Sequence, residues 1–188
     1  MTSVAPTRRE QILATAAELF AARGFHGVSV ADLGAACGIS GPALYKHFAS
    51  KDAMLAEMLV SISERLLSVG RERVASAGGD AAAALRALVD WHVDFALRHR
   101  PLIVVQDRDW ESLPAEARER VRALQRAYVD LWAAELRQLS TDLSLGAARA
   151  QAHAVFGLIN STPHSGRLPD EEMREMLTAM ALRALDVG

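Results

Sequence analysis

The sequence predicts an all-α fold, and three observations support this prediction. Only 5% of the residues are aromatic, whereas Ala, Leu, Arg and Glu recur throughout the chain, a composition that favours helices over sheets. Apolar residues recur at helical spacing, and no stretch alternates between apolar and polar residues as a strand would. Candidate N-caps and glycine breaks divide the chain into separate helices.

Composition places the chain in a broad class. With 188 residues, of which 51% are hydrophobic, the chain is long enough to bury a sizeable core. No run of about 18 apolar residues could span a bilayer, and the N-terminal MTSVAPTRRE lacks the apolar core of a signal segment. The single cysteine, Cys37, excludes a disulfide within the chain and fits a reducing compartment. We therefore expect a cytoplasmic protein with no membrane partner.

The stretch Val28 to Lys51 has the spacing of a helix-turn-helix. Ser29, with Asp32 in the capping-box position, can begin a first helix. Gly38 can end this helix, because glycine adopts the left-handed conformation that the corner needs. Ser40 can cap the second helix, and a proline in its first turn costs no hydrogen bond. The residues expected to face inward are Val30, Leu33, Ala36, Ile39, Leu44 and Phe48.

The outward face of the second helix suits a DNA major groove. Small residues at its N-terminal end allow close approach, and Tyr45 and Lys46 offer a hydroxyl and a cation to phosphates. A tight helical corner in a protein that binds no DNA has the same spacing, so the pattern alone leaves both interpretations open. The residues expected to face outward are Gly41, Pro42, Ala43, Tyr45, Lys46 and His47.

Two flanking helices complete this N-terminal region. Thr7 and Glu10 form a capping box for a first helix that ends at Gly24, and its stripe of Ile12, Leu13, Ala16, Leu19 and Phe20 faces the core. Arg8 and Arg9 at its start could meet a phosphate or could be solvated surface charges. Lys51 opens the next helix, where a cation opposes the helix dipole, so an external anion such as a DNA phosphate would explain its position.

Charge is distributed unevenly along the chain. The formal net charge is −2, but residues 1–51 carry +2 and the remainder carries −4. A basic N-terminal region would be attracted to nucleic-acid phosphates, whereas the acidic remainder of the chain would be repelled by them.

The run LFAARGFHGVSVADLGAACGISGPALYKHFASKDAML resembles the N-terminal domain of the TetR family of bacterial transcriptional regulators, over about the first 60 residues. This resemblance implies a homodimeric, ligand-responsive repressor that binds double-stranded DNA at a near-palindromic operator. It places a DNA-binding domain at residues 1–51 and a helical effector-binding and dimerisation domain at 52–188. For this motif we predict base contacts from Pro42, Ala43 and Lys46 and phosphate contacts from Tyr45, His47 and Lys51, with Ser40 and Gly41 completing the DNA-binding set.

The C-terminal region reads as a series of helices. We predict helices over 51–76, 81–98, 114–139, 144–161 and 169–187, with the apolar piece 102–105 between the second and third. The break NSTPHSG, from Asn160 to Gly166, should end the penultimate helix early. The last two helices carry more apolar surface than peripheral helices need, so we expect them to pair across a two-fold axis as a four-helix bundle. A hairpin buried within one chain is the alternative.

Aromatic and polar residues of the C-terminal region could line one apolar pocket. Each alone is also typical of a packed core. The stretch PLIVVQDRDWESLP, followed by RVRALQRAYVDLWAAEL, resembles the branch of the family that responds to acyl-CoA thioesters or other lipid-derived metabolites. The predicted ligand-binding residues are Trp91, His92, Phe95, Trp110, Tyr128, Trp132, Phe156 and Asn160.

Other function classes are less well supported. His92, His99, Asp107, Asp109, His153 and His164 are available as ligands, but no HExxH, CxxC or tight cluster marks a metal site. No nucleophile elbow or phosphate-binding glycine loop is present, so we expect neither an enzyme nor a cofactor. A metal-sensing regulator and an all-helical protein-interaction adaptor remain as alternatives. The adaptor would lack the steep loss of affinity with ionic strength that marks a DNA-binding protein.

Overall fold

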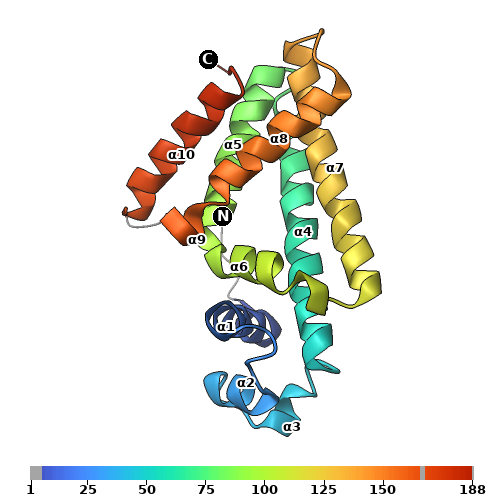
Figure 1. The fold of residues 1–188 in the computed structure, drawn as a ribbon, viewed down its shortest axis with the longest axis vertical. Helices are drawn as coiled ribbons and strands as arrows, with labels where there is room; N and C mark the ends of the chain where they lie inside the picture. The colour runs from blue at the N-terminus through green and yellow to red at the C-terminus, as the bar shows by residue number, and fades with distance from the viewer. Residues whose placement is uncertain (1–5, 166–167, 188) are drawn as a thin grey trace. The chain divides into compact units, whose positions relative to one another are not determined.

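The computed structural model describes residues 6–165 and 168–187, and every regular element in these residues is helical, as predicted. Part of the N-terminal stretch for which we predict no signal segment, and Gly166 of the predicted break, lie outside the described residues. The elements (Figure 1) are α1 (Arg8–Arg23), α2 (Val30–Ala36), α3 (Gly41–Leu44), α4 (Lys51–Ser76), α5 (Ala81–Arg98), α6 (Arg100–Arg108), the 3₁₀ helix η1 (Trp110–Ser112), α7 (Ala115–Leu139), α8 (Leu145–Ile159), α9 (Thr162–Ser165) and α10 (Asp170–Ala184).

Side-chain caps begin the helices where the sequence predicts them. The side chains of Thr7 and Ser29 each accept a hydrogen bond from the backbone N–H three residues on. The side chains of Glu10 and Asp32 accept in turn from the backbone N–H groups of Thr7 and Ser29, which completes both capping boxes. These hydrogen bonds from Ser29 hold the pKa of Asp32 below its usual range. Ser40, the third predicted cap, accepts in the same way, and Ser50, Asp80 and Ser144 also cap helices. None of the described helices has both the length and the apolar character needed to cross a membrane.

The chain divides into two compact units. Unit 1 comprises residues 1–61 and 101–120, and unit 2 comprises residues 62–100 and 121–188. Helices α4 and α7 each contribute residues to both units. Unit 1 therefore includes α6 and η1 besides the N-terminal helices, whereas the predicted domain boundary at residue 51 rests on sequence resemblance and remains a prediction.

Unit 1 packs α6 and η1 against the end of α1. The Arg108 guanidinium donates to the carbonyls of Phe20 and Ala21, which are at the C-terminal end of α1. Buried Asp109 accepts from the backbone N–H of Phe25 at 3.2 Å and pairs with Arg108. The bond to Ala21 satisfies a helix-end carbonyl, and the Phe20 carbonyl accepts from Arg108 in addition to the N–H of Gly24. Together these bonds fix the joint between α1 and α2.

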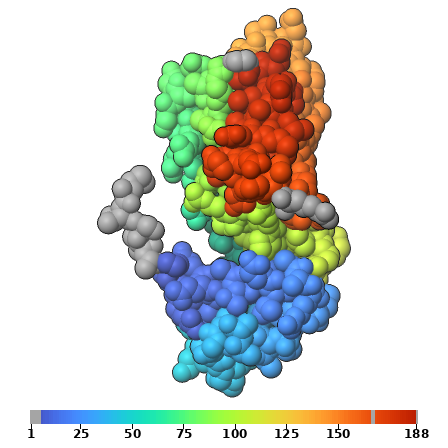
Figure 2. Space-filling model, turned by 90° about the vertical axis from the view of Figure 1, so that its left-hand side faces the viewer, coloured from blue at the N-terminus to red at the C-terminus, as the bar shows by residue number. Residues whose placement is uncertain are grey.

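Unit 2 is built around α5, which packs against both α8 and α10. Asp94 of α5 pairs with Arg174 of α10 at 2.8 Å, and Thr162 of α9 donates to the Ala96 carbonyl of α5. Helix α10 covers one face of this unit, as the red surface of Figure 2 shows. On the side of α7, Gly70 of α4 approaches Tyr128 so closely that a Cβ at this glycine would lie 2.8 Å from the tyrosine ring.

Two details of the predicted helices are wrong. Ala36, expected to face inward, is exposed, and Gly34 is buried in its place. Gly34 lies under the corner, where a Cβ would be only 2.8 Å from the Ile39 carbonyl oxygen. The predicted second helix of the motif is also shorter than expected, because α3 ends at Leu44.

Candidate functional site

The corner between α2 and α3 depends on two glycines. Gly38 has a φ of 66°, in the left-handed region, so it turns the chain where predicted. The Ile39 N–H then donates to the Gly34 carbonyl at 2.9 Å. Since Gly34 has no Cβ, the turn can lie directly on α2. Gly34 was not among the predicted inward residues, although a glycine inside an apolar helical pattern is a signal of close packing.

Helix α3 starts as predicted and tightens at its end. Ser40 caps it, and Pro42 lies in its first turn. After Leu44 the chain continues in turns, in which the N–H groups of Lys46 and His47 donate to carbonyls three residues back. Leu44 and Phe48 point inward, with 4% and 3% of their surface exposed. Leu44 and Phe48 therefore both face the core, as predicted, although the chain tightens after Leu44.

The predicted DNA-binding residues form one exposed strip in unit 1. Tyr45 is 54% exposed, and Ser40, Pro42 and Lys46 are exposed as well. Gly41, Ala43 and His47 are half-buried between them. The side chains of Tyr45 and Lys46 have no hydrogen-bond or ion-pair partner among the described residues. Both are thus available to an external group.

Lys51 has partners within the protein. Its ammonium donates to the Phe25 and Val28 carbonyls at 2.8 and 2.9 Å and lies 4.3 Å from the centre of the Phe25 ring. An ammonium has three donors, so one is left for an external acceptor. The two carbonyls already explain a cation at the start of α4, and the phosphate role of Lys51 remains a prediction.

Arg8 and Arg9 also bind their own chain. Arg9 pairs with Glu57, donates to the His47 carbonyl and stacks over the Phe48 ring at 4.2 Å. Arg8 donates to the Cys37 carbonyl. The two arginines hold α1 against the helix-turn-helix and the start of α4, a role that neither sequence interpretation included.

Seven of the eight predicted ligand-binding residues gather in unit 2. His92 stacks on Phe156 with ring centres 4.6 Å apart, and Tyr128 stacks on Phe156 at 5.4 Å. Trp132 meets Phe156 edge-on at 5.0 Å. We call the seven residues the aromatic cluster: Trp91, His92, Phe95, Tyr128, Trp132, Phe156 and Asn160. Trp110 is in η1 of unit 1 and is not part of it.

The aromatic cluster contains polar atoms that are buried without a hydrogen-bond partner among the described residues. These atoms are His92 Nδ1, Tyr128 Oη and Trp132 Nε1. Burial lowers the pKa of His92 to about 4, although its bond to Asn160 opposes the shift, and burial also raises the pKa of Tyr128. The imidazole is therefore neutral at pH 7. Unpaired buried polar atoms are costly, so a cluster with three of them is suited to a ligand that supplies partners.

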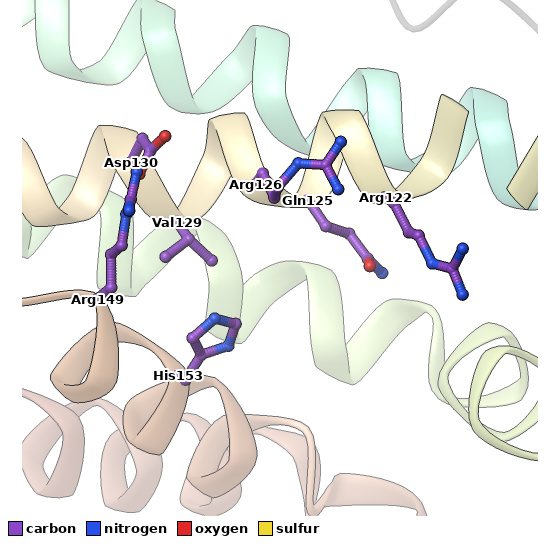
Figure 3. Close-up of a pocket in the computed structure, with 7 residues that line it drawn as sticks. All are labelled: Arg122, Gln125, Arg126, Val129, Asp130, Arg149 and His153. Atoms are coloured by element: carbon purple, nitrogen blue, oxygen red, sulfur yellow. The ribbon is translucent and has the colours of Figure 1, made fainter. Parts of the chain in front are cut away.

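An open pocket lies beside the aromatic cluster, between α7 and α8 (Figure 3). Its volume is about 350 Å³. None of the predicted ligand-binding residues lines it, but His153 on its wall is 6.2 Å from the Phe156 ring, centre to centre. Its lining residues are Arg122, Gln125, Arg126, Val129, Asp130, Arg149 and His153. Within the described residues no three His, Cys, Asp or Glu side chains gather as metal ligands.

Comparison with known proteins identifies the family. The model of bacterial regulatory proteins of the tetR family matches residues 12–58, and that of the tetracyclin repressor-like C-terminal domain matches residues 78–185. The chain belongs to the tetR family. It is therefore a DNA-binding transcriptional regulator by family and not an enzyme, and the resemblance seen in the sequence is confirmed.

Individual relatives extend this assignment. The chain is 31% identical to the transcriptional activator FasR of Mycolicibacterium smegmatis, over 85% of this chain and 71% of FasR. It is 35% identical to the repressor KstR2 of Rhodococcus jostii, over 66% of this chain and only 61% of KstR2. One of these relatives is thus an activator of transcription and the other a repressor.

Solved TetR structures share the fold. PfmR of Thermus thermophilus matches with a TM-score of 0.83 and 27% identity over 97% of both chains. AibR, solved with isovaleryl coenzyme A and operator DNA, has a TM-score of 0.70 and 24% identity over 93% of this chain and 97% of its own. FadR of Bacillus subtilis, solved with stearoyl-CoA, has a TM-score of 0.72 and 16% identity over 94% and 95%. The last two show likeness of fold alone.

Proposed function

We propose that two copies of this chain form a cytoplasmic repressor that binds a near-palindromic operator and releases it when a hydrophobic small molecule binds. The proposed effector is an acyl-CoA or another lipid-derived metabolite. The observation that carries the DNA-binding part is the exposed strip of α3 and the following turn, whose Tyr45 and Lys46 side chains have no partner among the described residues.

The chemistry of this strip assigns a role to each residue. The small Pro42 and Ala43 let the start of α3 approach base edges, and Lys46 reaches a base or the adjacent backbone. Tyr45, His47 and the third donor of Lys51 contact phosphates. Ser40 and Gly41 lie at the N-terminal end of α3 and complete the contact surface.

A dimer through α8 and α10 is supported by their exposed apolar residues. Met176 and Met180 on α10 are 38% and 41% exposed and lie one turn apart. On α8, Ala150, Ala154 and Gly157 are exposed small residues that would allow a second helix to approach closely. Two-fold pairing would give each operator half-site one recognition element, with half-sites about 34 Å apart.

The aromatic cluster is the proposed effector site. Its rings offer apolar surface, and its three unpaired polar atoms offer hydrogen bonds to a ligand. AibR and FadR, which share the fold, were each solved with a CoA thioester. These names support an acyl-CoA as the effector, and the resemblance of residues 101–136 to the lipid-responsive branch points the same way.

The proposed mechanism uses the close contact between Gly70 and Tyr128. Tyr128 belongs to the aromatic cluster, and a Cβ added at Gly70 of α4 would lie only 2.8 Å from its ring. A ligand that moves this ring would shift α4, whose N-terminal end follows the recognition element directly in the chain. Effector lowers DNA affinity only as far as it prefers the shifted state.

Selection of bound DNA fragments, followed by fluorescence anisotropy, tests this proposal. We expect the selected fragments to share a near-palindrome, and affinity to fall steeply with salt. Adding acyl-CoA should release the fragment if the chain is a repressor of this class. Failure to select any fragment would contradict the DNA-binding role, and tighter binding with acyl-CoA would contradict release by effector.

A further inference from the structure

We propose that the pocket between α7 and α8 binds the phosphate groups of a phosphate-bearing small molecule. The inference rests on the proposed function, because it names where the phosphates of a CoA-type effector would bind. Three arginines and one histidine line the pocket against a single carboxylate, Asp130. The pocket thus concentrates positive charge on a region, residues 52–188, whose formal net charge is −4.

The arginines come from two helices and line the same pocket. Arg122 and Arg126 are four residues apart on α7, and so are Arg149 and His153 on α8. Residues at this spacing share a helix face, and Figure 3 shows the side chains of both helices bordering the space between them. A planar guanidinium can donate two parallel hydrogen bonds to a phosphate, so a pocket lined by arginines of two helices favours a group with several anionic oxygens.

The charges of the pocket are only partly paired. Arg149 pairs with Asp130 at 2.6 Å, and this bond raises the pKa of Arg149. Arg126 is exposed and has no hydrogen-bond or ion-pair partner among the described residues. A bound phosphate would accept hydrogen bonds from Arg126 directly and would compete with Asp130 for those of Arg149. Removing the Asp130 charge should therefore improve binding, whereas removing an arginine should weaken it.

The lining and position of the pocket suit one end of an amphipathic ligand. Val129, 5% exposed, adds an apolar wall, and the neighbouring Tyr128 belongs to the aromatic cluster. On the other helix His153 faces the pocket and its ring lies 6.2 Å from that of Phe156. A volume of about 350 Å³ is at the small end of the range for ligand pockets, enough for the phosphate-bearing part of a larger ligand.

Calorimetric titration of the full chain with coenzyme A, inorganic pyrophosphate and adenosine tests the inference. We expect coenzyme A to bind more tightly than pyrophosphate, and adenosine not to bind. Arg126→Gln should weaken coenzyme A binding about tenfold. The double variant Arg126→Gln with Arg149→Gln should weaken it further, and Asp130→Asn should strengthen it. Arg73→Gln, which removes an exposed charge on α4, is the matched control and should change nothing. Circular dichroism melting curves establish that each variant folds.

The outcomes separate this inference from the proposed function. If coenzyme A binds the double arginine variant as tightly as the natural protein, or does not bind at all, the inference is wrong. Pyrophosphate binding as tightly as coenzyme A would assign the pocket to free phosphate compounds and overturn its link to the effector. If an acyl-CoA releases DNA from the natural protein and from the double variant at the same concentration, the proposed function is supported. The pocket then has no part in effector binding, and the inference is wrong. Arginine-dependent coenzyme A binding without DNA release would support the pocket and contradict the proposed effector.

Discussion

Lys51 has contacts within the chain that explain its position without DNA, and the sequence alone did not indicate them. Its ammonium bridges the Phe25 and Val28 carbonyls, and we predict that its remaining donor contacts a DNA phosphate. Lys46, five residues earlier, is exposed and has no side-chain partner among the described residues. Comparing the two lysines separates support of the fold from contact with DNA.

We predict that Lys51→Ala lowers both stability and DNA affinity, whereas Lys46→Ala lowers DNA affinity alone. Losing the charged hydrogen bonds of Lys51 should cost about 2 kcal/mol, or about 4–8 °C in melting temperature for a chain of this size. Lys51→Ala should also reduce the salt dependence of binding by about one phosphate contact. Calorimetry and anisotropy measure the two effects. An unchanged melting temperature for Lys51→Ala would contradict the bridging role.

His92 is a buried titratable residue in the aromatic cluster. Its pKa is about 4 in the folded chain, lowered by burial from the 6.5 of an exposed imidazole. Below pH 6.5 His92 therefore binds a proton in the unfolded chain but not in the folded chain. Stability attributable to the neutral imidazole is fully present above pH 6.5 and is lost as pH falls toward 4.

We predict that this loss amounts to about 3 kcal/mol between pH 7 and pH 4. His92→Gln cannot titrate but can still bond Asn160, so its stability should fall less over the same interval. Urea unfolding of both proteins across this pH range measures the difference. Parallel pH profiles would mean that His92 takes up a proton as readily in the folded chain as in the unfolded one.

At the scale of elements, Gly70 sets the distance between α4 and α7. A Cβ there would lie 2.8 Å from Tyr128 and 3.2 Å from Leu131, so the two helices meet with no room for a methyl group. Alanine is the better helix former by about 1 kcal/mol. Tight packing opposes this gain, because the displaced Tyr128 ring is held by Phe156 and Trp132.

We predict that Gly70→Ala destabilises the chain by about 1–3 kcal/mol and weakens the response to effector. Gly146→Ala in α8 is the control, because the nearest atom to its Cβ is 4.0 Å away. That substitution should be neutral or slightly stabilising. Chemical denaturation and effector titration of the DNA complex test both variants. Stabilisation by Gly70→Ala would show that helix propensity outweighs the contact and would remove the proposed link between Tyr128 and α4.

At the scale of the whole molecule, pairing of two chains determines whether two recognition elements can act together. The proposed interface is the exposed face of α8 and α10, where Met176 and Met180 lie one turn apart. Leu139, at the end of α7, is similarly exposed at 45% but lies outside this face. It therefore provides a matched control for a charge placed on an exposed apolar residue.

We predict that Met176→Glu with Met180→Glu converts the dimer to a monomer, because the charges would have to be desolvated in the interface. Operator affinity should then fall by at least about tenfold, since one half-site no longer assists the other. Leu139→Glu should leave both properties unchanged. Analytical ultracentrifugation and anisotropy measure them. A natural protein that sediments as a monomer at micromolar concentration would contradict the proposed interface.

The sequence by itself determined the features that depend on neighbours along the chain. The capping boxes at Thr7 and Ser29, the turn at Gly38 and the inward Leu44 and Phe48 were predicted correctly. Their physical causes are local, because caps act over three residues, glycine conformation over one, and helical periodicity over four.

Only the tertiary structure decided which distant groups meet. The carbonyl partners of Lys51 are 23 and 26 residues away, and Glu57 lies 48 residues from Arg9. Seven of the predicted ligand residues came together, but the tertiary structure assigned Trp110 to the other unit and brought arginines of α7 and α8 to one pocket. Helical periodicity states which face of a helix is apolar or charged, and packing alone selects the helix that this face meets.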